Sequence, residues 1–347
     1  MTDEPVHTDS GVRGVLLPEV SRWLCRPHRR HRHASDLEHR ARRWASDCGL
    51  AAGPAAVRLR AQGIDQLAAT AMSEERDEQV LLYARWLIWL FSLDDHVESH
   101  TDPQAIDTMF GNLLARTEVP DTDIHSSASA VHGTASGPAH VIERAFAELW
   151  QQTSRGMGSD WRARFSEDLR YQHTGCLREL RLRRSGTVPT IAEYPLLRRQ
   201  SGGMWIYDLP EAILGIELPP AFAATTLWHQ LVCHVSDAAN WCNDILSCPK
   251  EITDRVTMNY VLVARHELGL NHSDADQWVV GRIVARLDQA AALGQRVPDI
   301  ADHLGLPPAT IRDISRIACA TLNFPAAYLT WALDSLRYMS RPPTQHP

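Results

Sequence analysis

Apolar residues recur at helical spacing along most of this chain, and this pattern limits what it can fold into more than any other feature. Stepping back from Asp94 by four and three residues meets Leu90, Leu87, Tyr83 and Val80. Residues at this spacing share one face of an α-helix, whereas a strand would alternate apolar and polar residues. Strand signals are weak throughout, and the long segments are rich in the helix formers Ala, Leu and Arg. The sequence therefore predicts an all-α fold.

Capping residues place the helix boundaries. Ser35 and Glu38 form a capping-box pattern before an apolar stripe, and Gly49 is expected to end that helix. A second helix is predicted to begin at Ser73, with two acidic residues in its first turn, and to run to about Val97. Further helices are predicted over residues 141–154, 160–184, 190–215, 222–248, 256–266, 274–293 and 308–340.

No internal repeat or linker divides the chain, so one helical domain is predicted over residues 21–340. Residues 1–20 are expected to form a loosely ordered arm and residues 341–347 a short tail. The stretch 121–138, rich in Ser, Ala, Gly and His, is expected to be a loop between helices.

Charge and cysteine usage narrow the class of protein. The formal net charge of −7 argues against a general nucleic-acid or anionic-membrane binder, and no apolar run is long enough to suggest membrane insertion. Seven dispersed cysteines without a CxxC pair indicate reduced thiols and a cytoplasmic location. The basic segment 26–43, interleaved with His28, His31 and His33, is interpreted as a solvated face rather than a zinc or nucleic-acid site.

A first acidic cluster, Asp-Asp-His-Val-Glu, occupies residues 94–98. Asp94 ends the apolar stripe and Glu98 lies one turn further on, so their carboxylates should project the same way, roughly 6 Å apart. Carboxylates at the end of a buried face are costly unless a cation compensates them, and Mg²⁺ prefers such hard oxygen ligands. The cluster therefore favours a Mg²⁺ site, although the same pattern is also typical of a solvated acidic turn.

A second cluster lies near the middle of a later helix. Asn243, Ser247 and Glu251 fall at i, i+4 and i+8, on one line of a helix face. An amide oxygen, a hydroxyl and a carboxylate together suit Mg²⁺, and neither Asn nor Ser is favoured in a helix interior for its propensity. Pro249 interrupts this line and is expected to kink the helix.

These clusters resemble the metal motifs of bacterial class I terpene synthases. That family's first motif, Asp-Asp-x-x-Asp/Glu after aromatic and aliphatic residues, matches residues 91–98, with Glu at the last position. Its second motif, Asn-Asp-x-x-Ser-x-x-x-Glu, matches residues 243–251 at every defined position. The family often has a lysine before the final Glu, and Lys250, the only lysine of the chain, stands there.

Two further motifs of the family involve the diphosphate of the substrate. Residues 198–202 match Arg-x-x-(Ser/Thr/Asp)-Gly, which implies that Arg198 senses diphosphate and that Gly202 is the helix-break effector. Trp331 followed six residues later by Arg337 and Tyr338 matches the family's C-terminal pattern. The resemblance covers roughly residues 25–338 and implies a helical bundle with its active site in a central apolar cavity.

The resemblance also implies the metal stoichiometry. Three Mg²⁺ ions, or Mn²⁺ in their place, are expected with the substrate. Asp94, with Glu98 or Asp95 assisting, would hold two of them, and Asn243, Ser247 and Glu251 would hold the third. The ions would neutralise the leaving diphosphate.

Cationic and phenolic side chains are expected to donate to the diphosphate oxygens. They are Arg198, Lys250, Arg337 and Tyr338. Aromatic faces could stabilise passing carbocations by roughly 0.5–2 kcal/mol each, although an aromatic stripe is more often ordinary core. The residues expected to line the cavity are Leu87, Phe91, Trp205, Tyr328 and Trp331, with Phe324 on the same helix face.

The predicted function is Mg²⁺-dependent cyclisation of an allylic prenyl diphosphate, with farnesyl diphosphate as the leading substrate. The product would be a cyclic terpene hydrocarbon or alcohol together with diphosphate, and the enzyme a monomer or homodimer. A prenyl-elongating synthase shares the fold and the first motif but needs a second Asp-Asp-x-x-Asp, which this region lacks. A non-catalytic protein that binds an isoprenoid diphosphate is the remaining alternative.

Overall fold

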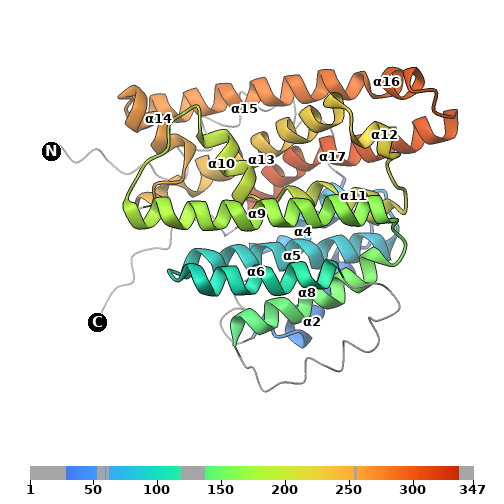
Figure 1. Cartoon of the computed structure of the whole chain (residues 1–347), viewed down its shortest axis with the longest axis horizontal. Helices are drawn as coiled ribbons and strands as arrows, with labels where there is room; N and C mark the ends of the chain where they lie inside the picture. The colour runs from blue at the N-terminus through green and yellow to red at the C-terminus, as the bar shows by residue number, and fades with distance from the viewer. Residues whose placement is uncertain (1–28, 53–58, 60–61, 119–136, 254–255, 336–347) are drawn as a thin grey trace.

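A computed structural model describes residues 29–52, 59, 62–118, 137–253 and 256–335 of the chain (Figure 1). Every regular element within these ranges is helical, which confirms the predicted all-α fold. In chain order the elements are α2 (Ala34–Asp47), α4 (Ile64–Ala71), α5 (Asp77–Ser99), α6 (Pro103–Thr117), α8 (Pro138–Ser154), α9 (Ser159–Ser185), α10 (Tyr194–Ser201), the 3₁₀ turn η2 (Met204–Tyr207), α11 (Leu209–Leu214), α12 (Pro220–Ala223), α13 (Thr226–Thr253), α14 (Tyr260–Leu268), α15 (His272–Gln295), α16 (Val297–His303) and α17 (Pro308–Asp334).

Eight of these helices pack side by side in a closed ring. Starting at α13, the packed neighbours are α17, α4, α5, α8, α6, α9 and α10, and α10 returns to α13. Helix α15 covers the outer side of α13, and α2 covers α5. The longest helices run along the long axis of the molecule (Figure 1). The ring therefore encloses a central space, and α5 and α13 reach it from different sides.

Tryptophan residues fill the core between α5, α8, α9 and η2. The rings of Trp86, Trp89 and Trp205 meet one another with centroids 5.4–5.6 Å apart, and Phe165 packs against two of them. The indole nitrogens are paired: that of Trp86 donates to the Thr153 hydroxyl at 2.8 Å. Large rings with satisfied polar edges give this side of the ring a rigid, dry core.

The start of α2 differs from the prediction. The helix begins at Ala34 with His33 as its N-cap, so the Ser35–Glu38 capping box is wrong. Glu38 instead forms ion pairs with Arg30 and Arg42, which remove its carboxylate from the helix end. Gly49 follows the helix with a φ of 86°, a left-handed conformation that suits glycine and agrees with its predicted role.

The first motif helix also starts later than predicted. Helix α5 begins at Asp77 rather than at Ser73, because the side chain of Gln79 accepts the backbone N–H of Arg76 and caps the helix there. The residues before it form a turn closed by the hydrogen bond from the Glu75 N–H to the Met72 carbonyl. Three helices were not predicted, namely α4, α6 and α16.

The predicted helix 190–215 is three short helices, α10, η2 and α11. Gly203 has a φ of 79°, and its left-handed conformation ends the α-helical path. The expected helix 308–340 corresponds to α17. Arg337, Tyr338, the arm 1–20, the tail 341–347 and most of the predicted loop 121–138 lie outside the described residues.

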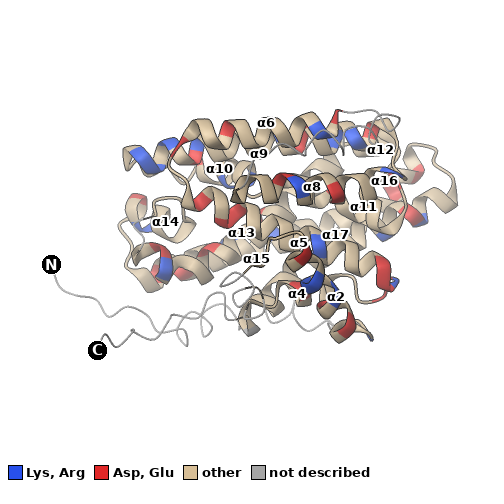
Figure 2. Cartoon of the chain, turned by 90° about the horizontal axis from the view of Figure 1, so that it is seen from below, with Lys and Arg blue, Asp and Glu red and all other residues tan. Residues whose placement is uncertain are grey.

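Acidic and basic residues are interspersed along the described helices in the view from below (Figure 2). None of the described helices is both long enough and apolar enough to cross a membrane. The cysteines in the described ranges are unpaired, and all except Cys319 are buried. The expectation of reduced, mostly buried thiols therefore holds for this part of the chain.

Candidate active site

The central space of the ring contains two joined compartments. A polar mouth lies between the C-terminal parts of α5 and α13, and an apolar inner compartment continues from it toward Phe324 of α17. Five residues line both compartments: Asp94, Gln172, Arg198, Ser201 and Asn243. A ligand with a charged head and an apolar chain would therefore find both environments in one continuous cavity.

The first cluster divides between two faces of α5. Asp94 and Glu98 both line the polar mouth, as their spacing predicts. Asp95 is exposed and lines a separate groove on the other side of α5, together with Ser92 and His96. The structure therefore brings Asp94 and Glu98 together with Asn243 and Glu251 of the second cluster and leaves Asp95 apart.

The side chains of the second cluster are fixed by hydrogen bonds. The amide nitrogen of Asn243 donates to the Tyr328 hydroxyl at 2.9 Å, so its oxygen turns to the other side and accepts from Arg198, also at 2.9 Å. The Ser247 hydroxyl donates to the Asn243 carbonyl at 2.8 Å and also lies within hydrogen-bonding reach of the Glu251 carboxylate. Helix α13 continues through Pro249 to Thr253, and Glu251 lines the mouth.

Glu251 is held in an environment that favours its neutral form. Burial, with Asp244 nearby, raises the pKa of Glu251 to about 7. The Asn259 side chain opposes this rise by donating to the Glu251 carboxylate at 2.8 Å. A buried carboxylate with so raised a pKa would gain from a neighbouring cation.

Arg198 connects the diphosphate-sensor motif to the second metal motif. Its Nε donates to the Asp244 carboxylate at 3.0 Å, while its terminal nitrogen donates to Asn243. Burial lowers the pKa of Arg198, but Asp244 and Tyr194 outweigh it and hold this pKa well above its usual range. Tyr194 donates to the other Asp244 oxygen at 2.7 Å. The guanidinium is thus charged, partly buried and fixed at the boundary between the two compartments.

Lys250 spans the mouth. Its ammonium lies 3.6 Å from the Glu98 carboxylate, and both side chains are largely exposed, at 64% and 45%. Arg183 of α9 lies beside them and donates to the backbone carbonyls of Glu98 and His100 at the end of α5. An exposed ion pair of this kind contributes little to stability, so exchanging it for an anionic ligand would cost the fold little free energy.

The residues expected to line the cavity are only partly brought together. Leu87, Phe91 and Tyr328 line the inner compartment, as does Phe324. Trp331 packs behind them, with its ring 5.3 Å from that of Phe91 and its indole N–H bonded to the Gln62 carbonyl. The predicted lining residue Trp205 belongs to the tryptophan core, and its indole N–H donates to Gln172 at 2.7 Å.

Gly202 lies where α10 ends and lines the inner compartment. A Cβ at this position would lie 2.7 Å from the Asn240 amide and 2.9 Å from the Arg198 carbonyl. Such contacts are too short for any side chain, so only glycine allows α10 and α13 to approach this closely.

Sequence reasoning missed three residues that hold the site. Asp244 is buried and anchors Arg198, although it falls within the second motif. Asn259 caps α14 and also binds Glu251, and an Asn before an apolar helical run is a signal that could have found it. Glu179 of α9 lines the mouth; burial raises the pKa of Glu179, which Arg198 and a hydrogen bond from Ser201 oppose. No motif pointed to it.

The donors of the mouth fit a divalent cation that also binds phosphate. Asp94, Glu98, Asn243 and Glu251 line the mouth from two helices, together with Arg198 and Lys250. Ser247 lies one turn after Asn243 and is hydrogen-bonded to its carbonyl. Hard oxygen ligands beside guanidinium and ammonium groups suit an ion that shares its coordination with phosphate oxygens.

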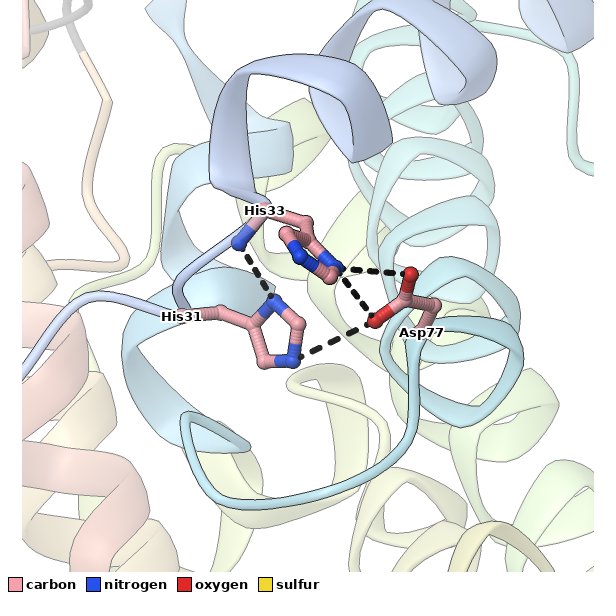
Figure 3. A group of neighbouring side chains, drawn as sticks. All are labelled: His31, His33 and Asp77. Atoms are coloured by element: carbon pink, nitrogen blue, oxygen red, sulfur yellow. Dashed lines mark hydrogen bonds and ion pairs between the residues drawn. The ribbon is translucent and has the colours of Figure 1, made fainter.

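A second group of metal-binding residue types lies at the start of α2 (Figure 3), where His31, His33 and Asp77 place one ligand atom each within 4.8 Å. The backbone N–H of His33 donates to His31 Nδ1 at 3.2 Å, so the proton of His31 sits on Nε2, which contacts the Glu75 carbonyl at 3.0 Å. Both ring nitrogens of His31 therefore already have hydrogen-bond partners. The group links the start of α2 to the start of α5 and is not a metal site. The interpretation of segment 26–43 as a solvated face is wrong for His31, which is buried.

Comparisons with known proteins agree with this geometry. Residues 85–289 match the model of terpene synthase family 2, C-terminal metal binding. The chain is 27% identical over 273 residues to (−)-δ-cadinene synthase of Streptomyces clavuligerus, covering 78% of this chain and 80% of that protein. It is 31% identical over 242 residues to a (+)-T-muurolol synthase of Roseiflexus castenholzii, covering 68% and 69%. The solved linalool/nerolidol synthase of S. clavuligerus, in complex with 2-fluorogeranyl diphosphate, superposes with a TM-score of 0.76 at 22% identity, over 88% of this chain and 100% of that one.

The helical ring and its two-compartment cavity define the class I terpene synthase fold. The chain belongs to the metal-binding terpene synthase family whose model it matches over more than half its length. It is a lyase that depends on a divalent metal, ionises a prenyl diphosphate and cyclises the resulting carbocation.

Proposed function

We propose that this terpene synthase converts farnesyl diphosphate to a cyclic sesquiterpene with Mg²⁺ as its metal. The observation that carries the proposal is the join between the two compartments, where Asp94, Arg198 and Asn243 line both. A diphosphate held in the mouth would extend its hydrocarbon chain into the inner compartment. The choice of farnesyl is supported by the T-muurolol synthase, whose name specifies farnesyl diphosphate cyclisation.

Three Mg²⁺ ions are proposed, with Mn²⁺ as the alternative metal. Asp94 and Glu98 would hold two of them, and Asn243, Ser247 and Glu251 would hold the third. The position of Asp95 in the separate groove gives it no direct contact with the mouth in this arrangement. The metal supplies Lewis-acid neutralisation of the leaving diphosphate.

The chain's own donors complete the diphosphate site. Arg198 would exchange its bond to Asn243 for the diphosphate oxygens, and Lys250 would leave Glu98 for the same ligand. Arg337 and Tyr338 are proposed as further donors on their motif alone. Gly202, at the end of the Arg198 helix, would relay the binding of diphosphate to the inner compartment. Leu87, Phe91 and Tyr328 would enclose the cation, with Trp331 and Trp205 supporting the wall from behind.

The catalytic unit is proposed to be one domain over residues 21–340, acting in the cytoplasm as a monomer or homodimer without nucleic-acid partners. The single test of the function is incubation with Mg²⁺ and the C10, C15 and C20 prenyl diphosphates, with products analysed by gas chromatography–mass spectrometry. We expect a cyclic C15 product that disappears when metal is chelated. Absence of a terpene from every substrate would refute the proposal, and elongated diphosphates on addition of isopentenyl diphosphate would favour a prenyl-elongating enzyme.

A further inference from the structure

The inner compartment has one polar section in a mainly apolar wall. Leu87, Leu90, Phe91, Ile206 and Phe324 make most of the surface beyond the mouth. Asn240, Tyr207 and Tyr328 interrupt it, and the Tyr328 hydroxyl already accepts from Asn243. A polar group facing an apolar cavity costs free energy unless it finds a hydrogen-bond partner, so Asn240 and Tyr207 need an explanation.

Ser236 links the two polar side chains. The Asn240 amide nitrogen donates to the Ser236 hydroxyl at 3.1 Å, one helical turn back on α13. Burial raises the pKa of Tyr207, and a hydrogen bond from Ser236 opposes the rise. Tyr207 therefore keeps its proton at neutral pH, and its O–H remains a donor.

The amide oxygen of Asn240 ends this series of hydrogen bonds with no partner of its own among the described residues. Within the described part of the molecule this oxygen accepts no hydrogen bond, since the only hydrogen bond of the side chain is the donation to Ser236. Gly202 keeps the amide in place, because the absence of a Cβ there leaves room for both amide atoms. The carbonyl oxygen is thus an unmatched acceptor in a cavity that also contains a phenolic donor.

We propose that Asn240 and Tyr207, oriented by Ser236, bind the water molecule that captures the final carbocation, so that the main product is a terpene alcohol. This inference rests on the proposed function. A water at this wall would donate to the Asn240 oxygen and accept from the Tyr207 hydroxyl, and a buried water needs two or more such partners.

The chemical step balances with species that the reaction already contains. The water oxygen gives a lone pair to the cationic carbon and forms the C–O bond. One O–H bond of the resulting oxonium then breaks, and the proton passes to the diphosphate released at ionisation. Without a held water, loss of a C–H proton to the diphosphate would give a hydrocarbon instead.

The test is turnover of farnesyl diphosphate in oxygen-18-labelled water, followed by mass spectrometry of the product. We expect an alcohol carrying one labelled oxygen. In Asn240→Leu the hydrocarbon-to-alcohol ratio should rise about tenfold, the effect of one hydrogen bond of about 1.4 kcal/mol. Ser236→Ala should also raise the hydrocarbon-to-alcohol ratio. It changes the size of the side chain less than Asn240→Leu does, so it provides the test if Asn240→Leu does not fold.

Asn112→Leu on the outer face of α6 is the matched control, because that exposed amide contacts only Glu143. Its product ratio should equal that of the wild type. A wild-type product that is hydrocarbon alone would overturn the inference, as would an alcohol whose ratio is unchanged in both cavity variants. Absence of any terpene would instead count against the proposed function.

Discussion

The two metal motifs hold their oxygens in different ways. On α5, Glu98 is exposed, and among the contacts described for it its carboxylate meets only the exposed ammonium of Lys250. On α13, Asn243 is oriented from both sides, by Tyr328 and Arg198, and Glu251 is buried beside Asn259. The first motif therefore offers charge that can adjust to a ligand, whereas the second offers a prearranged set of oxygens.

The largest loss of activity should come from substitutions in the second metal motif, on α13. Asn243→Ala removes a predicted metal ligand and one of the two acceptors of the partly buried Arg198. We expect kcat/KM to fall by at least about 10³-fold because charge neutralisation of the diphosphate is lost, and the free energy of unfolding to fall by about 1–3 kcal/mol because a buried donor loses its partner. Enzyme assays and urea denaturation measure both. An active variant would show that Asn243 is not a ligand.

Asp94 and Asp95 sharpen the comparison within α5, since these neighbours face different cavities. Asp94→Asn should lower kcat/KM by about 10²–10³-fold, the usual cost of one electrostatic contact to the transition state. Asp95→Asn should change it by less than about threefold, because the residue is exposed outside the mouth. Equal losses in the two variants would place Asp95 in the metal site and contradict the division between the faces.

The raised pKa of Glu251 predicts how metal binding depends on pH. Below about 7 the carboxyl is protonated, and a protonated carboxyl cannot ligate a cation. The half-saturating Mg²⁺ concentration should therefore rise about tenfold for each pH unit below 7 and level off above it. Glu251→Gln should weaken Mg²⁺ binding and remove this dependence. A dependence that persists in the variant would assign the titration to another group.

The smallest effect on stability is expected for the exposed Lys250–Glu98 pair at the first metal motif. Lys250→Gln breaks the exposed pair with Glu98, which should change the free energy of unfolding by less than about 1 kcal/mol. The KM for substrate should rise, because one cation for the diphosphate is lost, and Lys250→Arg should restore most of it. Thermal denaturation and steady-state kinetics separate the two roles. A strongly destabilised variant would mean that the pair is structural.

The helical fold and most of the site could be predicted because both rest on local spacing. Asp94 and Glu98, or Asn243 and Ser247, share a helix face wherever the helix begins, so an error such as the Ser73 start did not move them. The partners of those residues could not be predicted. Tyr328 meets Asn243 from α17, and Asn259 meets Glu251 from the start of α14, through packing that no local pattern encodes. The separation of Asp95 from Asp94 likewise depends on which helix covers which face of α5.

The central claim is that α5 and α13 bind diphosphate together through metal. Isothermal titration calorimetry of the full chain with inorganic diphosphate tests it most directly, with and without Mg²⁺. We predict binding in the presence of Mg²⁺ that is lost on chelation and lost equally in Asp94→Asn and Asn243→Ala, while Asp95→Asn binds as the wild type does. Metal-independent binding, or binding that survives in either of the first two variants, would contradict the account.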